Sequence, residues 1–487
     1  MKKALIIFIF LIIIAIAIAP LLFGSKTEEA YHQITDQLST GERIKLERGK
    51  YNKGFLESSG TSVATVIWDV PTQQNSTIKK AEPVSFKINH HILHGPFPEI
   101  RQGNLRPAQA MITTTLDPST KTKQALGDLF PNGNPVTIKT WITLEGNSRS
   151  IISAAGIKKQ SNDKGELEWH GLTGEINYDD RDKRFTTELE LPLFSFTDNT
   201  GLEIRIKNMR FHSDLLAAGA TSLVVGDLEL SLDELMFHTL DQMSATHGFR
   251  IGDIALSTAS RILNNQYHTT VDLQIQDLFV RQRQYGPVMY DVSLKQLDID
   301  ALDRVRREMH AVQNSNIPVE QQRIIAGGKF LSLLPTLLKS SPVLDINQIS
   351  FYFEDEQFRI SANVSVNNEH KFNSKAPLAF LTVLDTQADI TIPKQMLAAL
   401  PKPKSRITSS DNNDATKTRT RPGIVERMDS LAQQGYFKTD DRFYYTKLIY
   451  KAGQLTLNGQ LFSPVQANKS SSIGNTVKGK EQPDSGG

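Results

Sequence analysis

The pattern of apolar and polar residues begins with one uninterrupted apolar segment, Ala4 to Phe23, which carries no charged or polar side chain. A helix of this length, at a rise of about 1.5 Å per residue, spans about 30 Å, the thickness of a bilayer's hydrocarbon core. A cleaved signal peptide is the alternative, but the small-residue site at 17–19 is followed directly by Pro20, which should obstruct cleavage. We therefore expect residues 1–24 to form an uncleaved transmembrane anchor.

The charges that flank this segment predict its orientation. Lys2 and Lys3 precede it, whereas the first lysine beyond it, Lys26, is soon followed by two glutamates. Because positively charged flanks stay in the cytoplasm, the N-terminus should be cytoplasmic and the rest of the chain should cross the membrane. In a bacterium the body would then lie in the periplasm, held at the inner membrane by Ala4 to Phe23.

Beyond the anchor, apolar residues recur mostly with a period of two, as in Leu189, Leu191 and Leu193, which is typical of strands with one buried face. The most informative pattern is a ten-residue phrase that is apolar at its first, third, fifth, eighth and tenth positions. Its four copies start at Leu202, Leu228, Val271 and Tyr290, and a partial fifth copy starts at Leu344.

The step of three residues inside each copy would turn the later apolar residues to the opposite face of a regular strand. A β-bulge at that step absorbs one residue, restores a single buried face and bends the strand. Repeated bulged strands predict a long, curved antiparallel sheet rather than a compact barrel. The copies are irregularly spaced, so they do not predict a strict solenoid.

Helical spacing appears twice after the fourth copy. Leu302 to Val312 predicts one helix, with Asp300 as its N-cap. A second helix is predicted from Val319 to Ser340, where Pro335 should kink or end it. Its apolar surface is wider than a surface helix needs, so the helix either packs on the concave side of the sheet or forms a lipid-facing lid.

The end of the chain alternates between polar and structured segments. Residues 401–422 and 466–487 are nearly devoid of apolar side chains, which predicts a flexible loop and a disordered tail. Between them, 423–465 should form a small unit: a helix from Ile424 to Gln434 stopped by Gly435, then a hairpin. The hairpin's strands are expected at Phe443 to Tyr450 and Gln454 to Leu457.

The fold class expected is therefore mainly β with some α: an N-terminal transmembrane helix, a long curved sheet of bulged strands with helices packed on it, and a C-terminal helix-hairpin unit. Residues 25–400 form the β-rich envelope domain in this division.

Composition narrows the function classes. Lys and Arg number 55 against 53 Asp and Glu, a net charge of +2, so nucleic acid is not expected as a partner. The chain has no cysteine, which excludes disulfides, thiolate catalysis and cysteine metal sites.

No common hydrolase or nucleotide-binding motif occurs, and we expect no catalytic residue and no cofactor. His90 and His94 are weak metal candidates, because they would share a face only on a helix, whereas the surrounding residues alternate as in a strand. A catalytic pair would need His94 with Glu99, or His170 with Asp179, to converge from separate elements.

Several short stretches behind the apolar segment form a motif set in a fixed order. Its residues are Gly49, Tyr51, Gly54, Phe55, Ser58, Ser59, His94, Gly95, Pro96, Phe97, Gly286, Pro287, Pro335, Gly435, Gly453, Asn458 and Gly459. Together these stretches resemble the YdgA-like family of bacterial inner-membrane-anchored proteins of unknown function. The resemblance covers nearly the whole chain, and the polar segment 401–422 looks like an insertion. The family supplies no catalytic residue, and three of its glycines, at positions 95, 286 and 459, are expected where strands turn.

The function expected is that of a non-enzymatic envelope protein whose curved sheet presents a binding surface. The ligand could be a lipid held in a β-groove or a protein partner, including a second copy paired at the sheet edge. An enzyme, such as a hydrolase, is the less favoured alternative.

Overall fold

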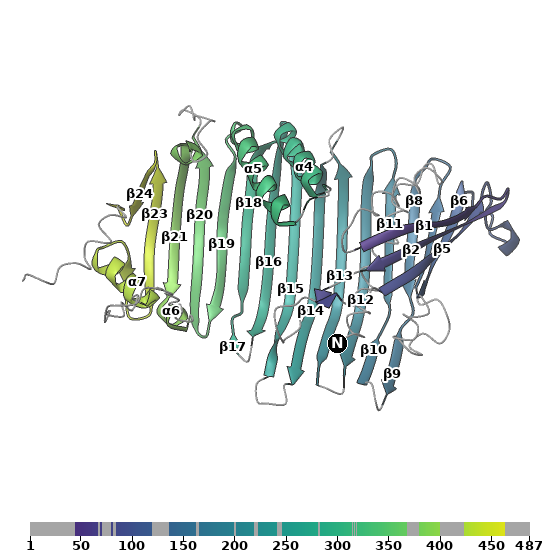
Figure 1. The fold of residues 1–487 in the computed structure, drawn as a ribbon, viewed down its shortest axis with the longest axis horizontal. Helices are drawn as coiled ribbons and strands as arrows, with labels where there is room; N and C mark the ends of the chain where they lie inside the picture. The colour runs from purple at the N-terminus through teal and green to yellow at the C-terminus, as the bar shows by residue number, and fades with distance from the viewer. Residues whose placement is uncertain are drawn as a thin grey trace, which may run out of the picture. The chain divides into compact units, whose positions relative to one another are not determined.

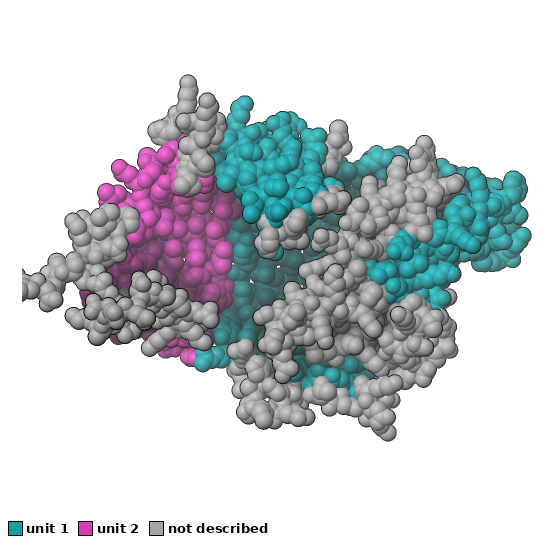
Figure 2. Space-filling model, viewed as in Figure 1, with its two compact units in different colours: residues 1–342 teal, residues 343–487 magenta. Residues whose placement is uncertain are grey.

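The computed structural model describes residues 44–66, 69–70, 79–80, 84–118, 136–161, 165–198, 201–218, 223–240, 246–280, 283–313, 315, 317, 319–367, 379–399 and 423–462. The chain divides into two compact units, residues 1–342 and 343–487, which Figure 2 colours teal and magenta. The expected anchor (1–24), polar loop (401–422) and tail (466–487) lie outside the described residues. Among the residues that are described, no helix is long and apolar enough to cross a membrane.

The first unit consists mainly of strands, with two long helices at its end (Figure 1). Its strands are β1 (Ile44–Asn52), β2 (Glu57–Val66), β3 (Asp69–Val70), β4 (Lys79–Lys80), β5 (Val84–His94), β6 (Ala110–Pro118), β7 (Val136–Ile142), β8 (Ser148–Ala154), β9 (Ile157–Ser161), β10 (Gly165–Trp169), β11 (Leu172–Asp179), β12 (Arg184–Thr197), β13 (Glu203–Ala217), β14 (Val224–Leu240), β15 (Thr246–Leu263), β16 (Gln266–Val280), β17 (Arg283–Gln284) and β18 (Val288–Asp298). A short 3₁₀ helix, η2 (Ile100–Gln102), lies between β5 and β6.

These strands form an antiparallel sheet in which most neighbours follow chain order. The pairing runs β1–β2–β5–β6–β7–β8–β11–β12 and then strand by strand to β16 and β18. β9 and β10 extend β8 and β11, and β3 and β4 pair separately. The expected long antiparallel sheet is therefore present in this unit.

One end of the sheet curls until its first strands lie over later ones. Figure 1 shows β1, β2 and β5 crossing in front of β11 to β13. Buried side chains from both layers form one core; Ala64 and Phe86 of the early strands belong to the same cluster as Leu191 and Phe194 of β12. Burial of these side chains at roughly 25 cal/mol per Å² is what stabilises the curled end.

Cross-strand pairing aligns apolar residues on the face that carries this core. Because residues directly opposite one another point to the same face, each aligned series forms a continuous apolar row across the sheet. The first row is Trp169, Phe194, Ile206, Leu235, Ile251 and Leu278. The second row is Leu189, Phe211, Leu230, Leu256, Leu273 and Tyr290.

The step of three in the first three copies falls on a single line across the sheet. The described strand pairing skips Pro192, Asn208, Asp233, Asp253 and Gln276, and resumes beyond them without a change of register. Asn208 and Asp253 have φ near +49°, a left-handed conformation that Asn and Asp tolerate better than most residues. We call this series of skipped positions the line of breaks. Because the skipped residues of neighbouring strands lie opposite one another, the extra residue of each strand is matched by one in the next strand, and the register does not change.

The apolar face stays continuous across the line of breaks without a shift of register. Ile206 and Met209, on either side of Asn208, both pack against the same core, which confirms the prediction of a single face. The expected register-shifting bulge is wrong for these three copies, because the breaks are in line. It is confirmed in β18, where Gln296 has φ +62° and the register shifts, and in β19 between Ile346 and Ile349.

The same line corrects one strand pattern. Leu193 lies just beyond Pro192 and pairs with Lys207, an exposed residue, so it points away from the core that buries Leu191. The apolar alternation resumes instead at Phe194 and Phe196, both buried.

Two helices, α4 (Ile299–Gln313) and α5 (Val319–Leu338), follow β18. Leu333 and Leu337 of α5 pack with α4 and with the apolar face of β16 and β18, which confirms that the helix packs on the sheet. The N-cap side chain is Asp298, whose Oδ1 accepts from the Ala301 N–H at 2.8 Å, and not Asp300 as expected. Pro335 does not end α5, which continues to Leu338.

The second unit holds β19 (Val343–Phe353), β20 (Glu356–Val366), η4 (Ala379–Val383), β21 (Leu384–Pro393), α6 (Lys394–Ala399), α7 (Ile424–Gln433), β22 (Lys438–Thr439), β23 (Phe443–Lys451), β24 (Gln454–Leu457) and β25 (Gln460–Leu461). Its strands pair in the order β19–β20–β21–β23–β24–β25, all antiparallel. The expected helix and hairpin are confirmed as α7 and β23–β24, and the hairpin joins this sheet through β21.

Candidate binding faces and the motif residues

The apolar face of the first unit extends well beyond the core of the curled end. The core reaches β13 only through Ile204, Ile206 and Met209. In β14 to β16 most apolar side chains of the two rows are half-buried. Phe237 and Phe249 stack with their ring centroids 5.8 Å apart and remain 36% and 37% exposed. A row of partly exposed apolar side chains across several strands can accommodate a long hydrophobic ligand.

The opposite face of the same strands is polar and carries a trough of about 830 Å³. Its lining includes three consecutive residues from each of six strands, and the outer two of each three point to the polar face. The trough therefore runs across the strands. Glu175, Glu188, Glu190 and Glu229 lie along it, with Arg210 and His212 between them.

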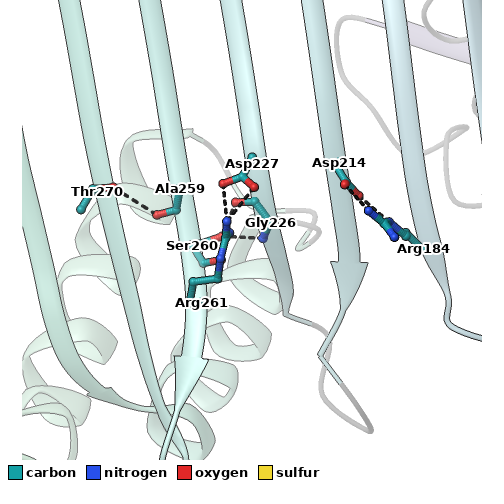
Figure 3. A network of polar contacts seen from close by, with 8 residues as sticks. All are labelled: Arg184, Asp214, Gly226, Asp227, Ala259, Ser260, Arg261 and Thr270. Atoms are coloured by element: carbon teal, nitrogen blue, oxygen red, sulfur yellow. Dashed lines mark hydrogen bonds and ion pairs between the residues drawn. The ribbon is translucent and has the colours of Figure 1, made fainter.

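Ion pairs follow the polar face beside the trough (Figure 3). Arg184 forms a two-bond pair with Asp214 of the neighbouring strand, and Arg261 donates to both carboxylate oxygens of Asp227 at 2.7 and 2.6 Å. The hydrogen bond from Arg184 lowers the pKa of the Asp214 carboxyl below its usual range. These side chains are partly exposed, so each pair contributes little stability and mainly fixes the charged surface.

The first motif residues converge where β1, β2 and β5 end. Ser58 Oγ accepts from the Gly54 N–H at 3.1 Å and shares a 2.8 Å hydrogen bond with His94 Nε2. The His94 N–H donates to the Leu56 carbonyl at 2.8 Å. These contacts bind the β1–β2 loop to the end of β5, and they account for Gly54, Ser58 and His94 as a structural cluster.

The motif glycines here are required by close backbone approach. A Cβ on Gly49, Gly54 or Gly95 would lie 2.0 to 2.2 Å from an oxygen of Thr61, Glu57 or Ala108, respectively. The same holds at Gly286, where a Cβ would lie 2.5 Å from the Gln276 carbonyl oxygen. Gly95–Pro96 and Gly286–Pro287 are both cis peptides. Both glycines lie where a strand ends and the chain turns, as expected: Gly95 directly follows β5, and Gly286 lies between β17 and β18. Neither has a positive φ, so close approach and not a left-handed conformation requires glycine at these turns.

The last motif residues are accounted for by turns of the second unit. Gly435, at φ +81°, ends α7, and Gly453 and Gly459 lie in the turns that flank β24. Asn458 tolerates φ +50°, accepts from the Lys447 N–H and donates to the Tyr436 carbonyl at 2.9 Å. The expectation for Gly459 is confirmed.

The remaining motif residues fall into two groups. Tyr51 packs against the core, Ser59 lies within the β1–β2 pairing, and Pro287 and Pro335 lie before β18 and inside α5. Phe55 and Phe97, by contrast, are exposed in loops, Phe55 by 94%.

His90 is a buried strand residue. Its Nδ1 lies 2.8 Å from Thr114 Oγ1 of β6, and burial lowers its pKa to about 4. His94 instead bonds Ser58, and the described residues contain no group of three or more metal-ligating side chains.

The catalytic pairs considered from the sequence have other partners. Glu99 accepts from Asn104 Nδ2 at 2.6 Å and from Trp141, whereas His94 bonds Ser58. His170 bonds Glu168, and Asp179 lies at the far end of β11. The sequence missed the charged face of β11 to β16; the signal for it was the polar half of the same alternation that predicted the apolar face.

Comparison with known proteins places the chain in a bacterial family. Residues 1–465 match the family described as "Bacterial protein of unknown function (DUF945)", and the chain belongs to it. No curated protein and no solved structure matches the chain.

Proposed function

We propose that this protein is a non-catalytic binding protein of the bacterial envelope, anchored in the inner membrane by Ala4 to Phe23, that holds the acyl chains of a lipid on the apolar face of β13 to β16. The observation that carries the proposal is the pair of apolar rows, which remain half-exposed beyond the core of the curled end. With strands about 4.8 Å apart, the four strands β13 to β16 provide an apolar path of roughly 15 Å across the sheet.

Rigidity of this face favours binding. The rows lie on strands paired along their whole described length, apart from the line of breaks, so the side chains are ordered before a ligand arrives. Preorganisation lowers the entropy lost on binding. The Ser58–His94 pair has no catalytic role in this proposal, because it holds a loop to a strand.

The test is site-specific photo-cross-linking of the full chain in cells labelled with radioactive phosphate. A photoreactive phenylalanine analogue replaces Phe249, on the apolar face of β15, and in a control strain it replaces Ser257, exposed on the polar face of the same strand. A third strain carries the analogue at Leu11, inside the apolar segment, to verify labelling.

We expect light-dependent transfer of phosphate label to the protein from position 249 and none from position 257. Label at position 11 without label at position 249 would overturn the lipid assignment. A discrete protein adduct from position 249 would instead assign the face to a protein partner.

A further inference from the structure

Three neighbouring loops at one end of the curled sheet expose large apolar side chains. They join β1 to β2, β5 to β6, and β7 to β8, which the antiparallel order brings to the same end. We call them together the apolar tip, and its exposed side chains are Phe55, Leu56, Phe97, Ile100, Leu105 and Leu144. Phe55 is 94% exposed, and Leu105 and Leu144 are 65% and 60% exposed.

The exposure of these side chains is not a consequence of loose loops. The Ser58 and His94 contacts described above fix the first loop, and Gly95 and Gln109 donate backbone hydrogen bonds to Gln109 and Ile142, respectively, each at 2.8 Å. Pro96 accepts from the Ala108 N–H at 3.0 Å. Backbone and motif contacts therefore hold the apolar side chains outward in a preformed arrangement.

Single exposed apolar residues are common on soluble proteins, but a cluster of them marks a surface that meets an apolar partner. The candidates are a bilayer, a second copy and another protein. The charges within the loops nearly balance: Lys53, Arg101 and Arg106 stand against Glu99 and Glu145, a net charge of +1. A highly charged partner is therefore not indicated.

The length of the chain favours the bilayer. The apolar segment ends at Phe23, and residues 24–43 connect it to Ile44, the first residue of β1. Those residues reach at most about 70 Å when extended. β1 runs from Ile44 toward the tip and covers about 30 Å. The tip can therefore touch the membrane that holds the anchor.

We infer that the apolar tip inserts its side chains into the interface of the anchor's own bilayer. This inference rests on the anchor of the proposed function but not on lipid binding by the sheet face. It gives the exposed motif residues Phe55 and Phe97 a role that packing does not give them. It also orients the first unit, with the β1–β2 loop toward the lipid.

The test uses the full chain reconstituted in nanodiscs of mixed phosphatidylglycerol and phosphatidylcholine. Because the natural sequence has no cysteine, one introduced thiol can carry a polarity-sensitive fluorophore at a single position. The variants are Phe55→Cys and Leu144→Cys in the tip, with Ser257→Cys on the polar face of β15 as the matched control. Spin-labelled lipids serve as quenchers.

We expect emission from both tip positions to shift to shorter wavelength and to be quenched by the spin-labelled lipids, with position 257 unchanged. Replacing phosphatidylglycerol by phosphatidylcholine alone should leave the quenching nearly unchanged, because the loops carry a net charge of only +1. Unquenched tip positions in a chain that does enter nanodiscs would overturn the inference. Emission shifts that depend on protein density and not on quencher would assign the tip to a second copy.

A chain that fails to enter nanodiscs at all would instead refute the anchor, and with it both proposals. Folding of each variant is checked by circular dichroism; because positions 55, 144 and 257 are exposed, substitution there should leave the core intact.

Discussion

Individual residues of this chain show how the same amino acid serves different physical needs. Gly95 and Gly286 make room for neighbouring backbone, and Gly435 and Gly459 adopt a left-handed conformation. Gly327 in α5 does neither, since no heavy atom is found within 4 Å of where its Cβ would lie. Sequence alone marks all of them as glycines in motifs or helices and cannot separate the three cases, because close approach depends on residues far along the chain.

Substituting Gly95 by alanine should destabilise the protein. The added Cβ would lie 2.0 Å from the Ala108 carbonyl oxygen, so the backbone must move, at a cost of about 1–3 kcal/mol. Thermal unfolding followed by circular dichroism measures the change. In the control, Gly327→Ala, the new methyl meets open space inside a helix and should stabilise by about 0.5–1 kcal/mol. Equal midpoints for the two variants would contradict the steric argument.

His90 should make stability depend on pH in a defined range. Burial lowers its pKa from 6.5 to about 4, so between these values the unfolded chain binds a proton that the folded chain does not. Stability is therefore full above pH 6.5 and falls as the pH drops toward 4, by a total on the order of 3 kcal/mol.

Urea unfolding at several pH values, compared between the natural chain and His90→Gln, measures this contribution. The variant should lose the pH-dependent part and should also be less stable at pH 7, because the contact with Thr114 changes. His91→Gln is the matched control, since its side chain is 53% exposed on the same strand. A slope unchanged by His90→Gln would show that another group is responsible.

At the scale of elements, the sequence predicted what depends on local pattern. The period-two strands, the α7 helix, the β23–β24 hairpin and the bulges in β18 and β19 follow from spacing and turn residues. The alignment of Asn208, Asp233 and Asp253 could not be predicted, because it requires knowing which residues face each other across strands. The cap at Asp298 was missed because the helix begins earlier than the apolar spacing indicates.

The line of breaks yields a prediction for Asn208. Its φ of +49° is unfavourable for a β-branched residue, so Asn208→Val should destabilise the first unit by about 1–2 kcal/mol and should also lose the hydrogen bond to Asp233. Asn208→Gly should lose only the hydrogen bond. The comparison is made by urea unfolding.

Lys207→Val provides the control, because Lys207 is an exposed strand residue with a regular partner at Leu193. It should be neutral or slightly stabilising, in line with the strand preference of valine. If Asn208→Val were as stable as Lys207→Val, the left-handed residue would not be needed to keep the apolar face continuous.

At the scale of the whole molecule, both proposals depend on the membrane anchor that the sequence predicts. The curl of β1, β2 and β5 over β11 to β13 was not predictable from spacing, since it joins residues more than a hundred positions apart. This curl buries one part of the apolar face and leaves the part over β14 to β16 partly exposed.

The proposed function requires that the body of the protein lies on the far side of the inner membrane from the cytoplasm. If Lys2 and Lys3 keep the N-terminus in the cytoplasm, as we expect, alkaline phosphatase, which folds only outside it, should be active when fused after Gly487. The same reporter fused after Lys3, before the apolar segment, should be inactive and controls for expression. A variant with Lys2→Glu, Lys3→Glu, Glu28→Lys and Glu29→Lys moves the positive charge from before the apolar segment to after it. This variant should lower the activity of the C-terminal fusion. An inactive C-terminal fusion in the natural chain would place the body of the protein in the cytoplasm and would overturn the envelope location in the proposed function.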